Sequence, residues 1–299
     1  MGKPILCVGA LTLDTIFRLD ALPRGAGKVL PLEAVEVAEG MAAAQAASIV
    51  RLGGAAALWA SRGDDANGEK LQAQISAAGV DCSSVRVVAG ARSGFSTILM
   101  DRDGHTIIVP QYDEALRSSP AEVPEMSRFV AVMVDVRWPA AAEMALRAAR
   151  EQGIPGILDA DVAPAEVLER LFPLASHVIA SEGGAALLGG SADPRRAAAA
   201  LAGRHSGLIV VTAGREGGFW FDRTSIALRQ VPARPVEAID TLAAGDVFHA
   251  GFAVGLVKGW DVERTLQFAS VAAAIKCTRF GGRLGCPTRD EVEAFSPAA

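Results

Sequence analysis

Short apolar runs alternate along the chain with alanine-rich segments. The runs span residues 5–9, 129–134, 154–158, 177–180 and 208–212. Nearly continuous apolar runs of this length are typical of strands that are buried on both faces of a parallel sheet. The segments between them are rich in good helix formers and span residues 41–52, 69–78, 140–152, 163–171 and 195–204. The alternation predicts an α/β fold in which helices cover both faces of a mostly parallel sheet.

Two segments depart from this alternation. Residues 16–37 read as extended chain interrupted by prolines and glycines, and residues 93–110 read as a hairpin whose tight turn is Asp103-Gly104. Together they predict a small β-sheet that covers a crevice of the α/β body. The expected division is a body made of residues 1–13, 38–92 and 111–299, with an inserted lid made of residues 14–37 and 93–110.

Composition narrows the possible functions. The 299 residues include 29 Lys and Arg against 34 Asp and Glu, and this acidic balance argues against nucleic-acid binding, which needs a basic face. The four cysteines form no Cys-x-x-Cys pair and are too scattered for a disulfide scaffold, which favours a reduced, cytoplasmic protein. The first apolar run is too short to span a bilayer, so no membrane partner is expected.

Several common nucleotide and catalytic motifs are missing. No Gly-x-Gly-x-x-Gly follows the first strand, and Gly27-Lys28 lacks the residues of a P-loop. The sequence also contains no His-Glu-x-x-His and no Gly-x-Ser-x-Gly, and its four histidines show no metal-ligand spacing. These absences weaken the dinucleotide, P-loop, zinc-hydrolase and serine-hydrolase interpretations.

The segment Asp240-Thr-Leu-Ala-Ala-Gly-Asp-Val-Phe248 carries the sharpest chemical signal. Its small residues precede an acid and an apolar helix, so backbone N–H groups and the positive helix end can approach an anion. A carboxylate at Asp246, beside that anion, is placed to take a proton from an attacking hydroxyl. The alternative is that Asp246 only caps the helix, but a cap does not require Ala-Ala-Gly before it.

This segment resembles the signature of the ribokinase-type (PfkB) carbohydrate kinases. The resemblance extends over the chain, through Val8-Gly9 with Asp14, Arg51-Leu-Gly53, Gly63-Asp-Asp-x-x-Gly68 and Val211-Thr-x-Gly214. It implies a doubly wound α/β fold with a β-sheet lid and transfer of the γ-phosphate of ATP to a primary hydroxyl of a sugar, with Mg²⁺ and possible K⁺ as cofactors. It also implies a possible homodimer formed through the lid.

The resemblance assigns roles residue by residue. Asp246 becomes the base, and the amides of Ala243, Ala244 and Gly245 hold the transferring phosphate. The residues implied at the nucleotide are Ser181, Thr212, Gly214, Gly217, Gly281 and Gly282, and those implied at the sugar are Asp14, Lys28, Gly40 and Arg137. Glu182 is the candidate Mg²⁺ ligand and Asp240 the candidate ligand of a monovalent cation. Asp159 and Asp161 could reach a metal or simply end a strand, and we favour the structural role.

The chain departs from the family pattern at two places. The usual Gly-Gly-x-x-x-Asn becomes Glu39-Gly-Met-Ala-Ala-Ala44, and the usual Asn-x-x-Glu becomes Ser181-Glu-Gly-Gly184. Asn67 is the only asparagine, so a shifted alignment cannot supply either amide. Two interpretations follow: a degenerate protein that binds sugar or nucleotide without turnover, or a branch with a different substrate and metal arrangement.

A closer resemblance favours the second interpretation. The segments Asp135-Val-Arg-Trp138, Leu158-Asp-Ala-Asp161, Asp246-Val-Phe-His249 and Cys277-Thr-Arg-x-Gly-Gly-Arg283 resemble bacterial 6-deoxy-6-sulfofructose kinases. This resemblance implies that Arg137 contacts the sulfonate, because the rigid donor fork of arginine suits an anion with three acceptor oxygens. The alternatives for Arg137 are a solvated side chain or an ion pair with Asp135. Lys28 could close over the same anion or be an ordinary charged residue of an edge strand. A fructokinase, ketohexokinase or ribokinase remains the alternative activity.

Overall fold

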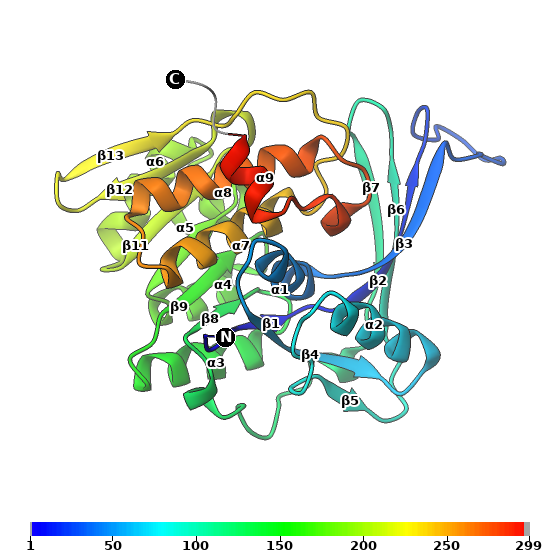
Figure 1. Ribbon diagram of the computed structural model, residues 1–299, viewed down its shortest axis with the longest axis horizontal. Helices are drawn as coiled ribbons and strands as arrows, with labels where there is room; N and C mark the ends of the chain where they lie inside the picture. Colours follow the sequence, from blue (N-terminus) through cyan, green and yellow to red (C-terminus); the bar gives the residue numbers. More distant parts are fainter. Residues whose placement is uncertain (1, 296–299) are drawn as a thin grey trace.

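A twisted, mostly parallel sheet forms the centre of the computed structural model, which describes residues 2–295 (Figure 1). Its strands lie in the order β13-β12-β11-β10-β9-β8-β1-β4-β5, and all neighbours pair in parallel except β11-β12 and β12-β13. The strands are β1 (Ile5–Gly9), β4 (Ala56–Gly63), β5 (Arg86–Val88), β8 (Ala131–Val134), β9 (Gly156–Ala160), β10 (His177–Ala180), β11 (Leu208–Thr212), β12 (Gly218–Asp222) and β13 (Ala227–Val231).

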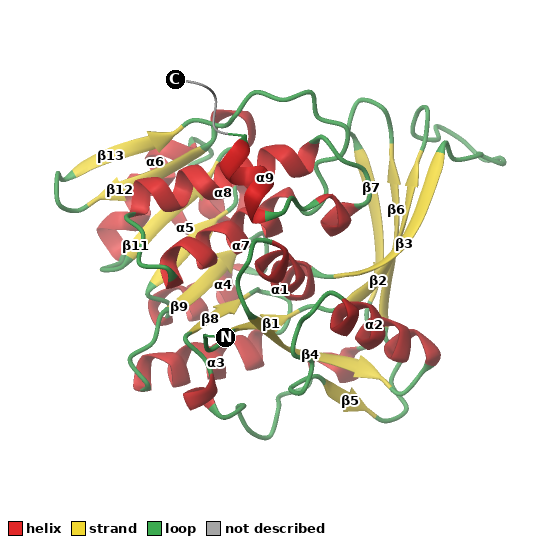
Figure 2. Ribbon diagram, viewed as in Figure 1, coloured by secondary structure: helices red, strands yellow, loops and turns green. Residues whose placement is uncertain are grey.

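Helices cover both faces of this sheet, which confirms the predicted α/β architecture (Figure 2). Along β1, Ile5 and Cys7 pack into one core, whereas Leu6 and Val8 pack into the other. Because successive side chains of a strand point to opposite faces, a strand buried on both faces must be apolar throughout. The helices are α1 (Met41–Arg51), α2 (Ala66–Ala77), α3 (Pro139–Glu151), α4 (Ala165–Leu171), α5 (Glu182–Gly189), α6 (Pro194–Arg204), α7 (Ala244–Val257), α8 (Val262–Cys277) and α9 (Arg289–Ala294). Within residues 2–295, no helix combines the length and apolar character needed to cross a membrane.

A second sheet stands beside the body and forms the predicted lid (Figure 2). Its strands are β2 (Thr12–Arg18), β3 (Glu33–Glu39), β6 (Gly94–Met100) and β7 (Thr106–Gln111), in the order β3-β2-β6-β7. The sheet is mixed, because β2 pairs with β6 in parallel while β2-β3 and β6-β7 are antiparallel. Strands β2, β3 and β7 extend one or two residues beyond the expected lid segments, since pairing extends from Thr12 with Glu39 to Phe95 with Gln111.

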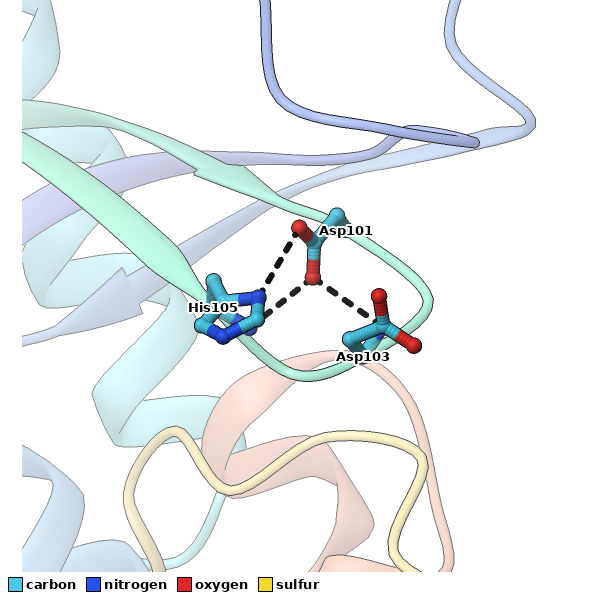
Figure 3. A group of neighbouring side chains, drawn as sticks. All are labelled: Asp101, Asp103 and His105. Atoms are coloured by element: carbon cyan, nitrogen blue, oxygen red, sulfur yellow. Dashed lines mark hydrogen bonds and ion pairs between the residues drawn. The ribbon is translucent and has the colours of Figure 1, made fainter.

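Asp101, Asp103 and His105 lie close together in the β6-β7 turn, at the tip of the lid (Figure 3). The Asp101 carboxylate accepts hydrogen bonds from the backbone N–H groups of Asp103 and His105, and its second oxygen lies 3.1 Å from His105 Nδ1. Gly104 supplies the positive φ of the turn, at +83°. These contacts are those of a side-chain-stabilised turn, as Asp103-Gly104 predicts.

Candidate active site

A cleft of about 550 Å³ lies where the lid meets the carboxyl ends of strands β1, β8 and β9. Ligands of open α/β sheets bind at this edge, because the loops that follow the strands converge there. The volume suits a small metabolite. The lining residues are Ala10, Thr12, Asp14, Glu39, Gly40, Met41, Ser96, Ile98, Ile108, Pro110, Tyr112, Arg117, Arg137, Asp161, Leu242, Ala243 and Asp246.

Asp246 lies in the first turn of α7, at the floor of this cleft. The N-cap of the helix is Ala243, and no side chain caps the helix. The capping alternative for Asp246 is therefore wrong, because a residue three positions into the helix lies beyond the cap. Ala243 adopts the left-handed conformation (φ +58°, ψ +9°), which is costly for a residue with a Cβ and is concentrated at functional sites. The Ala244 N–H donates to the Thr241 carbonyl oxygen at 3.2 Å, and the remaining free N–H groups and the helix dipole make this turn a suitable anion site.

A network of buried side chains holds the Asp246 carboxylate. Gln45 Nε2 donates to Asp246 Oδ1 at 3.2 Å and to Asp159 Oδ2 at 2.6 Å. Burial, together with the nearby charge of Asp159, raises the pKa of Asp246 well above its usual range, while the bond from Gln45 opposes the rise. A carboxylate tuned upward in this way is a stronger base than an exposed aspartate.

His249 contacts Asp159 from its other side. Burial raises the pKa of Asp159 and lowers that of His249. His249 Nδ1 lies 2.7 Å from the Gly245 carbonyl oxygen, while Nε2 lies 3.3 Å from Asp159 Oδ1 and 3.4 Å from the Ile179 carbonyl oxygen. The structural role expected for Asp159 stays a prediction.

Asp14 and Gly40 form the wall of the cleft next to the lid. Asp14 lies on the lid strand β2, two residues inside it, and its buried Oδ1 has no hydrogen-bond partner among the described residues. Burial raises the pKa of this carboxyl. Gly40 has φ +94°, and a Cβ there would lie 2.7 Å from the backbone of Ala10, so only glycine lets the two loops meet. The open oxygen of Asp14 is an acceptor placed for a hydroxyl group.

Two arginines lie at the rim of the cleft. Arg137 donates to Asp161 Oδ2 at 2.7 Å and to the Val162 carbonyl oxygen at 2.9 Å, and its side chain is 37% exposed. The ion-pair alternative therefore names the wrong acid: the partner is Asp161, while Asp135 accepts only the backbone N–H of Arg137. Arg117 donates from Nε to the Arg137 carbonyl oxygen at 3.0 Å and also lines the cleft.

Asp135 joins the segments that build this wall. Its buried carboxylate accepts N–H groups from Ala10, Ala42 and Arg137, at 2.8, 3.1 and 2.7 Å. These residues follow β1, begin α1 and follow β8, so one side chain sets the relative position of three loops. The Asp135-x-Arg137 spacing thus has a structural reason.

The residues expected at the nucleotide lie outside the lining of this cleft. Ser181 and Thr212 stand at the carboxyl ends of β10 and β11, further along the same edge of the sheet. Ser181 caps α5 and donates to Asp161 Oδ1 at 3.0 Å, which connects that strand end to the cleft. Gly214 and Gly217 flank the short turn after β11, and Gly281-Gly282 begin the 3₁₀ turn Gly282–Gly285. The assignment of these six residues to a nucleotide stays a prediction.

Three other expected residues, Lys28, Glu182 and Asp240, lie outside the lining of the cleft. Lys28 lies in the exposed connection between β2 and β3 and does not line the cleft, because that connection extends beyond the lid strands (Figure 1). Glu182 is exposed at the first position of α5 and also lies outside the lining. Asp240 is fully buried and paired with Lys276, at 3.0 Å, so its carboxylate is not open to a monovalent cation.

Sequence reasoning missed several groups that line or support the cleft. Gln45 carried a usable signal, as a polar residue within the alanine-rich segment 41–47. Arg117 and Tyr112 carried none, because their position depends on the lid turning back over the body. Glu39 is buried in the lining, and burial raises its pKa to about 8 against the opposing effect of Arg283.

A β-sheet lid beside a carboxylate in the first turn of a helix agrees with the carbohydrate-kinase class, to which the comparisons assign the chain. The chain belongs to the pfkB family of carbohydrate kinases, whose model matches residues 3–289. Within this family it is an ATP-dependent sugar kinase.

Relatives and solved structures match nearly the whole chain. Ribokinase of Bacillus subtilis is 28% identical over 97% of this chain and 98% of its own length. The ATP-dependent ribose-1-phosphate kinase of Halopiger xanaduensis is 28% identical over 97% of each chain. A solved structure from Agrobacterium tumefaciens, assigned to the ribokinases, has a TM-score of 0.96 and 44% identity over 98% of this chain and 97% of its own. An E. coli protein assigned to ribokinase II, solved with ATP and Mg²⁺, shares the fold with a TM-score of 0.84 and 21% identity over 98% of each chain.

Proposed function

We propose that the chain phosphorylates a ketose that carries a fixed anion at the end opposite its reacting hydroxyl, and that the substrate is 6-deoxy-6-sulfofructose, phosphorylated at O1. The observation that carries the proposal is the distribution of charge in one cleft. Asp246 and the α7 N-terminus lie at the floor, while Arg137 and Arg117 lie at the rim. Arg137 is already paired with Asp161, and a neutral hexose would leave its remaining N–H donors, and those of Arg117, without a ligand anion.

The rim suits a sulfonate because donors converge on it. Two of the five N–H donors of Arg137 are used by Asp161 and Val162, which leaves others for a ligand. Tyr112 adds a hydroxyl beside them. A sulfonate brings one charge and three acceptor oxygens, which matches this donor-rich rim. The Halopiger xanaduensis relative is named for a sugar phosphate, which supports an anionic sugar within this family.

The reaction uses the floor of the cleft. Asp246 accepts the proton of the primary hydroxyl as the sugar oxygen bonds to the γ-phosphorus, and the bond from that phosphorus to the bridging oxygen of ADP breaks. The N–H groups of Ala243 and Gly245 stabilise the charge on the transferring phosphoryl group, and that of Ala244 joins them once it leaves the Thr241 carbonyl oxygen. Asp14 accepts a sugar hydroxyl at its unpartnered Oδ1, which orients the substrate.

The donor set around the cleft fits a hard divalent cation. Asp161 lines the cleft, and Glu182 follows Ser181, whose hydroxyl bonds to Asp161. Carboxylate oxygens are the ligands that Mg²⁺ prefers, together with phosphate oxygens and water. We propose that these two acids assist the phosphates of ATP in holding Mg²⁺, which neutralises developing charge on the phosphates.

A panel of sugars in a coupled assay of ADP release tests the proposal. The panel contains 6-deoxy-6-sulfofructose, fructose 6-phosphate, fructose, ribose and a nucleoside. We expect the highest kcat/KM for the sulfosugar, and a lower value for fructose 6-phosphate because its ester arm is longer. Fastest turnover of a neutral sugar would replace the proposal with a fructokinase or ribokinase activity. No turnover of any sugar, with nucleotide binding intact, would identify a degenerate sugar-binding or nucleotide-binding protein.

We also propose that two copies associate through their lids. Exposed apolar side chains gather on β7 and on the β2-β3 connection, namely Ile107, Ile108, Val109, Val29, Leu30 and Leu32. Exposed apolar side chains of this kind are typical of an interaction site. Light scattering should give twice the chain mass, and Ile107→Asp, which lies outside the lining of the cleft, should give a monomer. A wild-type monomer at assay concentration would overturn this proposal.

A further inference from the structure

A buried ion pair lies behind the candidate anion site, at the end of α8. Lys276 and Asp240 are both fully buried, and Lys276 Nζ lies 3.0 Å from Asp240 Oδ1 and donates to the Asp240 carbonyl oxygen at 2.7 Å. A buried ion pair is costly unless its remaining acceptors are satisfied. The structure therefore invites the question of what this pair contributes.

The Asp240 carboxylate joins two loops that the reaction needs. Oδ1 accepts the N–H of Leu242 at 2.7 Å, in the segment that leads into the first turn of α7. Oδ2 accepts the N–H groups of Gly281 and Gly282, at 2.9 and 3.0 Å. One carboxylate thus fixes the loop before Asp246 and the loop expected at the nucleotide.

The coordination of this carboxylate is complete. An ionised carboxylate has about four acceptor positions, and Lys276, Leu242, Gly281 and Gly282 fill four. No acceptor position is left for a metal ion, so a monovalent cation does not fit at Asp240. Gly282 also has no room for a side chain, since its φ is +59° and a Cβ would lie 2.2 Å from Glu39 Oε1.

Lys276, which supplies the positive charge, lies on α8, and α8 packs directly on α7. Lys276 is the last basic residue of α8, where the helix dipole favours a cation, and α7 and α8 lie side by side (Figure 1). The Cys277 carbonyl oxygen accepts hydrogen bonds from the N–H groups of Ile239 and Asp240, which fixes the segment around Asp240 to the end of α8. The ammonium group is therefore covalently tethered at a site that a free ion would otherwise have to enter.

We propose that Lys276 is a built-in cation: a positioning residue whose ammonium group holds Asp240, and through it both loops, so that turnover needs no monovalent metal ion. Lys276 does not touch the substrate. It acts by keeping the Leu242–Gly245 segment and Gly281-Gly282 in place to receive the phosphates.

The first test uses the wild-type enzyme and the sugar that it accepts. ADP release is measured in potassium, sodium and tetramethylammonium chloride at equal ionic strength, because screening alone changes with salt. We expect the same kcat in all three salts. A kcat that requires potassium would overturn the proposal.

The second test replaces the tethered cation with a free one. Lys276→Ala removes the ammonium group and opens space, whereas Lys276→Met removes the charge but fills the space and serves as the matched control. We expect both to lose roughly 10²-fold in kcat, comparable to the loss of an oxyanion-hole donor. Potassium, ammonium or methylammonium should restore the Ala variant in a saturable manner, and none should restore the Met variant. Wild-type kcat in both variants, or the absence of selective rescue, would overturn the proposal.

Two further measurements keep the result interpretable. ADP binding, measured by calorimetry without sugar, should weaken in Lys276→Ala and recover with potassium, so the outcome does not depend on the proposed sugar. If Lys276→Ala unfolds in tetramethylammonium, its Tm should rise specifically with potassium while that of Lys276→Met does not. Equal responses of the two variants would contradict a cation site.

Discussion

The floor and the rim of the cleft are built in opposite ways. At the floor, Gln45 and Asp159 are buried, Asp246 is half-buried, and Gln45 is hydrogen-bonded to both acids. At the rim, Arg137 and Arg117 are 37% and 42% exposed. Under the proposed function, the groups assigned to the chemistry are held by the core before substrate arrives, whereas the groups assigned to substrate choice remain solvated and open to substitution. Changes at the floor should therefore affect every substrate, and changes at the rim only some.

The largest effect is expected from Asp246→Asn. The variant should fold and bind ATP, but lose about 10²- to 10⁴-fold in kcat with every sugar, because the acceptor of the hydroxyl proton is gone. Asp261→Asn is the matched control, since Asp261 caps the neighbouring helix α8 and Asn caps equally well. Steady-state kinetics and ATP titration measure both variants. A near-normal kcat for Asp246→Asn would show that Asp246 is not the general base.

A smaller effect on the floor is expected from Gln45→Leu. Gln45 donates to the charged form of Asp246, so its loss raises the pKa of that carboxyl further. Since the base must be ionised, the acid limb of kcat/KM should move to higher pH, while kcat at alkaline pH is less affected. The pH profile is compared with that of Gln152→Leu, an exposed glutamine at the end of α3. Identical acid limbs in the two variants would show that Gln45 does not influence the pKa of the base.

The smallest effect concerns stability where lid and body meet. Burial raises the pKa of Glu39 from 4.5 to about 8, so its protonated form is favoured by folding. The stabilisation is complete below the unfolded pKa and is lost as pH rises through the folded pKa. We expect the wild-type Tm to fall between about pH 5 and pH 9, by roughly 2–4 °C for each kcal/mol lost, and Glu39→Gln to flatten the curve. Parallel Tm curves for the two proteins would show that Glu39 does not titrate in this range.

The sequence predicted the elements whose pattern is local. The apolar runs at β1 and β11, the lid hairpin and the segment before α7 were all visible in the order of residues. Strands β4, β5, β12 and β13 were not predicted; β4 was missed because its alanines have weak β propensity and its place between β1 and β5 comes from burial. Local pattern thus identified most of the sheet but not every strand within it.

The site followed the same division. Asp246, Asp14, Gly40 and Arg137 were predicted and line one cleft. Arg117 and the Lys276–Asp240 pair were not, because each depends on contacts between segments distant in the chain. Lys28, in contrast, was expected at the anion and lies in an exposed connection, since extended chain alone does not say where a loop turns.

The central claim is that the arginines at the rim bind an anionic group of the substrate. The ratio of kcat/KM for 6-deoxy-6-sulfofructose to that for fructose tests this claim most directly. The ratio is measured for the wild type, Arg137→Met and Lys28→Met, with Lys28 as the exposed control. A hydrogen bond to a charged group contributes about 1.5–3 kcal/mol, so Arg137→Met should narrow the ratio roughly tenfold or more by lowering the sulfosugar value. Lys28→Met should leave the ratio unchanged. A wild-type preference for fructose, or an equal loss on both sugars in Arg137→Met, would contradict the account.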